Sequence, residues 1–162
     1  MASDERAGSA AANTLVIEWQ RLLDEKNSTC PRCGSTEHEV EKAVQHLKQV
    51  LTPEGIAVDL MKKAIDPKTF KKDVLQSNKI MIAGKSLEEW LGAATGQSTC
   101  CEVCGDAECR TVEYANQTHE TIPADLIIKA ALLATSQIYN RPLPQPGKQK
   151  TTFPLLTKKN PG

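Results

Sequence analysis

The sequence predicts one α/β domain. Segments with strand character alternate with segments of helical periodicity in the order β-α-β-α-β, followed by a short helix, a hairpin and a closing helix. Strands that alternate with helices favour a layered α/β domain with right-handed crossovers. A chain of 162 residues is long enough for one hydrophobic core and short for two.

The strands are predicted from runs rich in branched and apolar residues that are bounded by turn signals. Three such runs cover residues 14–23, 56–65 and 79–84. A fourth segment, residues 111–122, is predicted to form a β-hairpin that turns at Ala115 to Gln117.

The helices are predicted from apolar spacing and capping signals. Ser35 or Thr36 is expected to cap a first helix that ends at Pro53, because Thr36 and Glu39 have the spacing of a capping box. Asp66 is expected to cap a short helix that runs to about Val74. Two further helices are predicted over residues 86–91, with Ser86 as the cap, and from Pro123 onward.

The domain limits follow from composition. Residues 1–12 are small and polar and are expected to be disordered, the body is expected over 13–139, and residues 140–162 form a proline- and lysine-rich segment expected to be flexible. With 20 basic and 20 acidic residues, no net field favours nucleic acid, and no apolar run is long enough to span a membrane. Because the first residues lack a signal-peptide pattern, a cytoplasmic location is expected.

The first chemical signal is the pair Cys30 and Cys33 in the stretch CPRC, which lies between a predicted strand and a predicted helix. Amide groups and the positive end of a helix dipole stabilise a thiolate at this place. The first cysteine of such a pair is usually exposed, so we expect Cys30 to be the nucleophile and Cys33 to be the resolving thiol. This hypothesis needs no cofactor, and the substrate would be a protein or small molecule that carries a thiol or disulfide.

Three stretches together, CPRC, SNKIMIAGKSLEEWLG and CCEVCGDAECRT, resemble an uncharacterised prokaryotic family of thioredoxin-like proteins, a domain of unknown function. The resemblance covers about residues 14–137. It implies a thioredoxin-like three-layer domain with a cysteine-rich loop insertion and a C-terminal hairpin plus helix. Thioredoxins carry a cis-proline before their third strand, whereas this sequence has Ser77-Asn78-Lys79 there. That departure places thioredoxin-type binding of a peptide substrate in doubt.

The second chemical signal is a cluster of four cysteines in ten residues: Cys100, Cys101, Cys104 and Cys109. Adjacent cysteines form only strained disulfides with one another, because their Cα atoms are about 3.8 Å apart. The cluster is therefore expected to form other disulfides, to bind zinc or another thiophilic metal, or to relay electrons to the first pair. Half-buried packing is a plainer alternative.

A non-enzymatic alternative is a zinc-binding module built from CPRCG and CCEVCG, each of which has the form of a zinc knuckle. The 67 residues between Cys33 and Cys101 are far more than compact zinc ribbons contain. Cys104 to Thr111 also matches the C-x5-R-T pattern of cysteine phosphatases, but Asp106 and Glu108 would repel an oxyanion there. The thioredoxin-like resemblance implies that the segment with the second cluster can fold back to the end of the domain that holds Cys30, and Gly92, Gly96 and Gly105 give it the freedom to do so.

Overall fold

The computed structural model describes residues 13–24, 26–99 and 107–139. Its main sheet has four strands in the order β2-β1-β3-β4. These strands are β1 (Thr14–Leu22), β2 (Ala57–Ile65), β3 (Lys79–Ile82) and β4 (Lys85–Ser86). β2 is parallel to β1, whereas β3 is antiparallel to both β1 and β4. The α/β fold class predicted from the sequence is confirmed.

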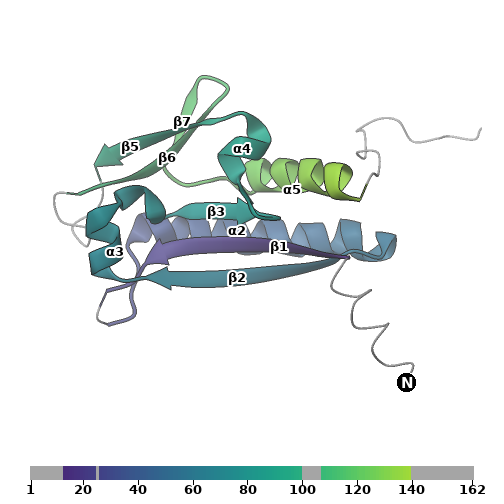
Figure 1. Cartoon of the computed structure of the whole chain (residues 1–162), viewed down its shortest axis with the longest axis horizontal. Helices are drawn as coiled ribbons and strands as arrows, with labels where there is room; N and C mark the ends of the chain where they lie inside the picture. Colours follow the sequence, from purple (N-terminus) through teal and green to yellow (C-terminus); the bar gives the residue numbers. More distant parts are fainter. Residues whose placement is uncertain (1–12, 25, 100–106, 140–162) are drawn as a thin grey trace, which may run out of the picture.

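A second sheet of three antiparallel strands, in the order β5-β6-β7, lies beside the main one (Figure 1). Its strands are β5 (Ala94–Thr99), β6 (Glu108–Tyr114) and β7 (Gln117–His119). The β6–β7 turn falls at Ala115 and Asn116, both with positive φ, as expected for a tight hairpin. The predicted hairpin is confirmed, but β4 and β5 are absent from the prediction. β5 has the sequence ATGQST, which lacks the apolar alternation that predicts a strand. It forms a strand because it pairs with β6.

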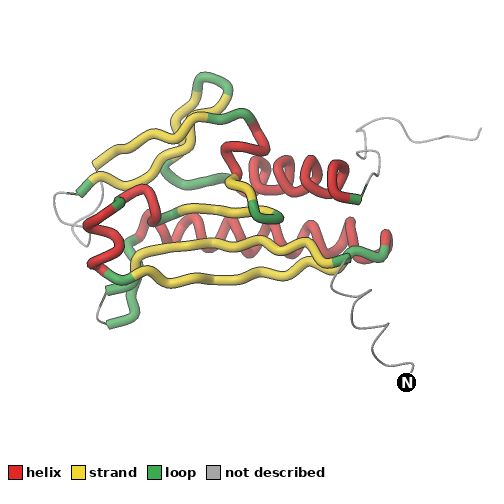
Figure 2. Tube along the Cα trace, in the orientation of Figure 1, coloured by secondary structure: helices red, strands yellow, loops and turns green. Residues whose placement is uncertain are grey.

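The helices cover the main sheet and link it to the second one (Figure 2). They are α2 (Pro31–Leu51), α3 (Pro67–Lys72), α4 (Leu87–Leu91) and α5 (Ala124–Ile138), with short 3-10 turns η1 (Thr52–Glu54) and η2 (Val74–Gln76). Helix α2 packs on β1 and β2 and also contacts α5. The caps predicted at Asp66 and Ser86 are confirmed, because their side chains accept hydrogen bonds from Thr69 N and Glu89 N.

The start of α2 differs from the prediction. The helix begins at Pro31, with Cys30 as its extended N-cap residue at φ −70° and ψ 159°. Proline favours the first helical position, because its φ is already helical and its missing N–H would have no partner there. Thr36 is buried inside the helix, where its Oγ1 accepts from Ile122 N at 3.3 Å, and Glu39 accepts from Ala124 N at 2.7 Å. These two side chains therefore fix the start of α5 on α2 rather than cap α2.

Two apolar clusters form the interior of the described part of the chain. The larger one lies between the main sheet, α2 and α5, and it contains the side chains of one face of β1: Leu15, Ile17 and Trp19. Cys30 and Cys33 belong to this cluster. The smaller cluster lies at the carboxyl end of β1 and consists of Leu22, Ile65, Phe70 and Cys109. The end of β1 is therefore the part of the sheet at which both groups of described cysteines are found.

Candidate functional site

The candidate site is the Cys30–Cys33 pair at the amino end of α2. The loop before it is fixed by Asp24, whose Oδ1 accepts from Lys26 N at 2.9 Å and from Ser28 N at 2.8 Å. Cys30 then ends the extended segment, and its carbonyl accepts the first helical hydrogen bond from Gly34 N at 2.9 Å. Cys33 lies in the first turn of the helix, and both cysteines are in the unoxidised thiol state. The predicted placement of the pair between a strand and a helix is confirmed.

The two sulfurs are electrostatically linked. Hydrogen bonding to Cys30 is the largest cause that raises the pKa of Cys33 far above its usual value, and burial adds to the effect. A hydrogen bond that raises the pKa of a thiol is one in which that thiol keeps its proton and donates it. The Cys33 thiol therefore donates to the Cys30 sulfur.

Burial of the pair overturns one expectation. Cys30 is only 2% exposed, although the first cysteine of the motif is predicted to be the accessible one, and Cys33 is 1% exposed. Between them in sequence, the Arg32 side chain is itself 8% exposed and turns toward the second sheet. Both sulfurs are therefore buried, although Pro31 and Ser35 in the same turn are exposed, and sequence spacing alone does not reveal this difference.

Arg32 joins the CPRC turn to the second sheet. Its Nη1 donates to the carbonyl oxygens of Ser98 at 3.3 Å and Thr99 at 3.4 Å, and its Nη2 donates to Ser98 Oγ. The same Nη2 lies 3.0 Å from Glu120 Oε1, and Ser98 Oγ donates to that carboxylate at 2.9 Å. A guanidinium with several donors is suited to hold two chain segments in a fixed relation.

Two hydroxyl groups that the sequence does not single out lie beside Cys33. Ser77 Oγ is 3.7 Å from Cys33 Sγ and accepts from Leu22 N at 3.0 Å. Thr29 also acts on Cys33, and both hydroxyls partly offset the rise in its pKa. In the sequence, Ser77 is singled out only through the thioredoxin-like resemblance, which implies a cis-proline in this segment. No cis peptide bond occurs among the described residues.

Asn78 continues that segment in a left-handed conformation, with φ at 59°. Its Oδ1 accepts from Trp19 Nε1 at 3.3 Å, and its Nδ2 donates to the Glu120 carbonyl at 3.3 Å. Asparagine tolerates positive φ better than most residues. The Ser77–Asn78 pair is therefore held rigidly against β1, which fixes the Ser77 hydroxyl beside the sulfur.

Of the four cysteines in the second cluster, Cys100, Cys101 and Cys104 lie outside the described residues. Cys109 is disulfide-bonded and fully buried in the smaller apolar cluster. Cys109 pairs with Ser98 in the β5–β6 register. The side chain of Ser98 also contacts Arg32. The two groups of described cysteines therefore lie at the same end of the domain.

The described part of the chain contains no group of three or more histidine, cysteine, aspartate or glutamate side chains that could hold a metal ion. His38 and His46 are exposed on α2, and His119 is partly exposed in β7. Arg110, which the phosphatase-like pattern would use to bind an oxyanion, is engaged elsewhere. Its Nη2 lies 2.8 Å from Glu88 Oε1, its Nη1 donates to the Leu75 carbonyl at 2.7 Å, and a strand follows it in place of a helix.

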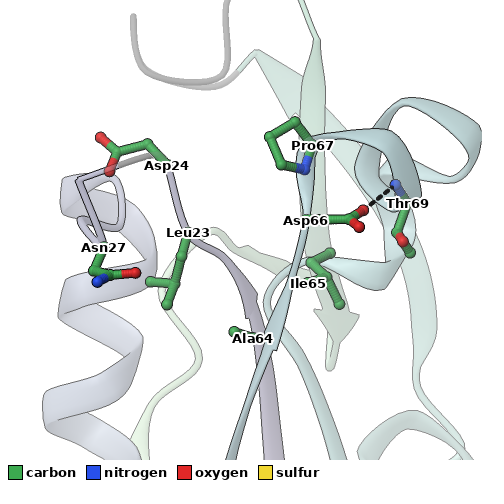
Figure 3. A pocket seen from close by; sticks show the side chains of 8 residues that line it. All are labelled: Leu23, Asp24, Asn27, Ala64, Ile65, Asp66, Pro67 and Thr69. Carbon is green, nitrogen blue, oxygen red and sulfur yellow. Dashed lines mark hydrogen bonds between the residues drawn. The ribbon is translucent and has the colours of Figure 1, made fainter.

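A surface hollow of about 420 Å³ lies at the carboxyl ends of β1 and β2 (Figure 3). Its two carboxylates accept hydrogen bonds from nearby backbone amides. Asp66 caps α3 by accepting from Thr69 N at 2.7 Å, a bond that lowers the pKa of its carboxyl group, and Asp24 holds its own loop. No cysteine lines the hollow, and both of its carboxylates accept hydrogen bonds from nearby backbone amides, so the sulfur pair is the stronger candidate site.

Comparison with known proteins places the chain in a family of unknown function. The family model described as a domain of unknown function, DUF2703, matches residues 15–131. The chain belongs to the DUF2703 family. An uncharacterized protein of Archaeoglobus fulgidus is 43% identical over 113 residues, which cover 70% of this chain and 82% of that protein.

The predicted membership in a family of unknown function is thereby confirmed for this DUF2703 protein. No solved structure matches the chain. None of the helices in the described ranges has the length and apolar character needed to cross a membrane.

Proposed function

We propose that this DUF2703 protein is a thiol–disulfide oxidoreductase in which Cys30 attacks a disulfide and Cys33 resolves the product. The observation that carries the proposal is the position of two linked thiols at one helix terminus. Cys30 is the N-cap residue of α2, and Cys33 in the first turn interacts with it through a hydrogen bond. The helix terminus favours negative charge on the first sulfur, and the second sulfur is within reach of it.

The chemistry has two exchange steps. The Cys30 thiolate attacks one sulfur of a substrate disulfide, so that the substrate S–S bond breaks, a mixed disulfide forms and the leaving thiolate takes up a proton. Cys33 then loses its proton and attacks Cys30 Sγ, which releases the second substrate thiol and leaves a Cys30–Cys33 disulfide. Two electrons pass to the substrate, and an external dithiol must return them for another cycle. No metal or organic cofactor takes part.

The topology supports a thioredoxin-like affiliation. A central strand flanked by a parallel neighbour on one side and an antiparallel one on the other, in the order β2-β1-β3-β4, agrees with that fold. The CPRC pair also begins the helix that follows β1, as the resemblance implies. The departure at Ser77-Asn78 remains, so the substrate class proposed is any accessible disulfide of a protein or small molecule.

The Cys109 disulfide is proposed to exchange with the first pair. Its strand neighbour Ser98 is bound by Arg32, and Leu22, which packs in the same cluster as Cys109, donates its amide to Ser77 beside Cys33. This arrangement supports an electron relay between the two cysteine groups at one end of the domain. A reducing compartment such as the cytoplasm suits this cycle, because it keeps the CPRC pair as thiols.

The test is disulfide exchange by purified reduced protein with a small aromatic disulfide whose thiol product absorbs light. Wild-type protein is expected to release two thiols in succession, and Cys33→Ser is expected to stop after one, with a mixed disulfide on Cys30. Ser35→Ala, which removes an exposed hydroxyl from the same helical turn, is the control.

The proposal is wrong if Cys30→Ser leaves the exchange rate unchanged. It is also wrong if anaerobically purified protein holds near-stoichiometric zinc with Cys30 and Cys33 protected from alkylation. That second result would favour the zinc-binding module.

A further inference from the structure

In the resolving step, a negative charge must form on the buried sulfur of Cys33, and the side chains around it have to stabilise that charge. Cys33 is 1% exposed, so its thiolate receives little help from water when it forms. A buried anion needs hydrogen-bond donors from the protein in place of water. The side chains that surround Cys33 therefore decide how fast the mixed disulfide on Cys30 is resolved.

Ser77 has one hydroxyl proton, and the geometry indicates where it points. Its Oγ accepts a hydrogen bond from Leu22 N at 3.0 Å, which fixes the position of the oxygen. Within the described chain, the contact recorded for the remaining O–H is Cys33 Sγ at 3.7 Å, a distance typical of a hydrogen bond to sulfur. Ser77 itself is fully buried, so water does not compete for this proton.

Thr29 supplies a second hydroxyl. It precedes Cys30 directly, and its Oγ1 is buried and makes no hydrogen bond that meets strict geometric limits. It nevertheless acts on Cys33 as a donor that lowers the pKa of the thiol. A buried hydroxyl without a close acceptor is costly in the resting state. It becomes favourable once a full negative charge develops on the neighbouring sulfur.

We propose that Ser77 and Thr29 form a pair of hydroxyl donors that stabilises the Cys33 thiolate during resolution of the mixed disulfide. This inference rests on the proposed function. Among the titratable groups of the described residues, Cys30 is the one that acts on Cys33. While Cys30 is a thiolate, it accepts the Cys33 proton, and Cys33 stays neutral. Once Cys30 is part of a mixed disulfide, it no longer carries a negative charge that accepts the Cys33 proton. The two hydroxyls then donate to the negative charge that forms on Cys33.

The assignment separates the two steps in time. Attack by Cys30 does not require a charge on Cys33, so Ser77 and Thr29 are not needed for it. Resolution does require that charge. The two hydroxyls therefore take the place of water for the second sulfur, at the position where the thioredoxin-like resemblance leads one to expect a cis-proline.

The experiment follows the same small aromatic disulfide, 5,5′-dithiobis(2-nitrobenzoic acid), in rapid mixing with the reduced full-length chain. The first thiol release reports attack, and the second reports resolution. Quenched samples are analysed by mass spectrometry for the adduct on the Cys30 peptide, and Cys30→Ser protein gives the background from other thiols. Ser77→Ala and Thr29→Val are each expected to slow the second release about tenfold, because one charge-assisted hydrogen bond is lost.

The first release is expected to stay within about twofold of wild type, which corresponds to about 0.4 kcal/mol. Ser77→Thr, which keeps the hydroxyl, should restore resolution. Thr135→Val removes a buried hydroxyl that donates to the Ala131 carbonyl within α5, and it is the control for Thr29→Val. If Ser77→Ala does not fold, Thr29→Val and Ser77→Thr still decide the question.

Equal slowing of both releases would show that the hydroxyls have a structural role, and this would overturn the inference. An unchanged rate of resolution in both Ser77→Ala and Thr29→Val would also overturn it. A failure of the proposed function itself would give a different result. Cys30→Ser protein would then exchange as fast as wild type, whatever residue stands at position 77.

Discussion

Arg32, which lies between the two cysteines of CPRC, donates from Nη1 to the Ser98 carbonyl at 3.3 Å, and Ser98 in turn faces Cys109 across the β5–β6 ladder. One side chain thus links the first cysteine pair to the strand that precedes the second cysteine stretch. The expectation that the second stretch returns to the end of the domain that holds Cys30 agrees with this link for Cys109. Cys30, two residues before Arg32, is 2% exposed.

Access to Cys30 is expected to depend on Arg32. Replacing Arg32 by Met removes its hydrogen bonds to Ser98 and Thr99 and its ion pair with Glu120 while keeping a long side chain. Because a buried charged hydrogen bond contributes about 1.5–3 kcal/mol, local opening should become on the order of tenfold more frequent. The measurement is the rate of alkylation of Cys30 by iodoacetamide, followed by mass spectrometry.

Lys129→Met, which removes an exposed cation on α5, serves as the control for loss of charge. Alkylation of Cys30 at the wild-type rate in Arg32→Met would show that these contacts do not limit access to the sulfur.

Stability of the reduced protein is expected to fall at alkaline pH because of Cys33. Its pKa in the folded state lies far above the value of an unfolded cysteine, about 8.5, so only the unfolded chain loses this proton as pH rises. The stabilisation is therefore complete below about pH 8.5 and decreases above it by about 1.4 kcal/mol per pH unit. Urea unfolding of reduced protein at pH 7.5, 9 and 10 measures this slope.

The Cys33→Ala variant isolates the contribution of this thiol, since alanine does not titrate. Its unfolding free energy should depend less steeply on pH by the same amount. Identical slopes for wild type and variant would mean that the Cys33 thiol titrates alike in both states.

The buried pair Glu88 and Arg110 should matter for stability. Each side chain is about 7% exposed, and Arg110 Nη2 is 2.8 Å from Glu88 Oε1. Arg110→Met leaves the Glu88 carboxylate buried without its cation, which is expected to cost about 3–5 kcal/mol in chemical denaturation. The double variant Glu88→Leu/Arg110→Met removes the uncompensated charge and should be less destabilised than Arg110→Met. A double variant as unstable as the sum of its parts would contradict this account.

The relay predicts that the Cys109 disulfide is reduced faster when Cys30 is present. With limiting dithiothreitol, wild-type protein should lose this disulfide about tenfold faster than Cys30→Ser protein, because a pre-positioned thiol replaces a bimolecular collision. The rate is measured by acid quenching, labelling with N-ethylmaleimide and mass spectrometry of the Cys109 peptide. Ser35→Ala is again the control, and equal rates in wild type and Cys30→Ser would exclude the relay.

Much of the domain could be predicted from local pattern, and the exceptions have identifiable causes. β1, β2 and β3 were recognisable because branched apolar residues recur at strand spacing. The start of α2 was misplaced because Thr36 and Glu39 have the spacing of a capping box, whereas their side chains accept hydrogen bonds from the start of α5, about 85 residues away in the chain. A local pattern does not distinguish between a partner in its own helix and one in another.

Some features of the candidate site could also be predicted from the sequence, and others depend on contacts between distant segments. The sequence predicts that Cys30 and Cys33 lie between a strand and a helix, which is confirmed, but it places the start of that helix at Ser35 or Thr36 instead of Pro31. The burial of the pair, the position of Ser77 beside Cys33 and the binding of Ser98 by Arg32 depend on tertiary packing. These relations join residues 44 and 66 positions apart, and packing of the main sheet against α2 and the second sheet brings them together. Local sequence propensities do not specify which distant segments of the chain meet. The pleat and pairing register of β1, β3 and β5 determine which residues come within hydrogen-bond distance of one another.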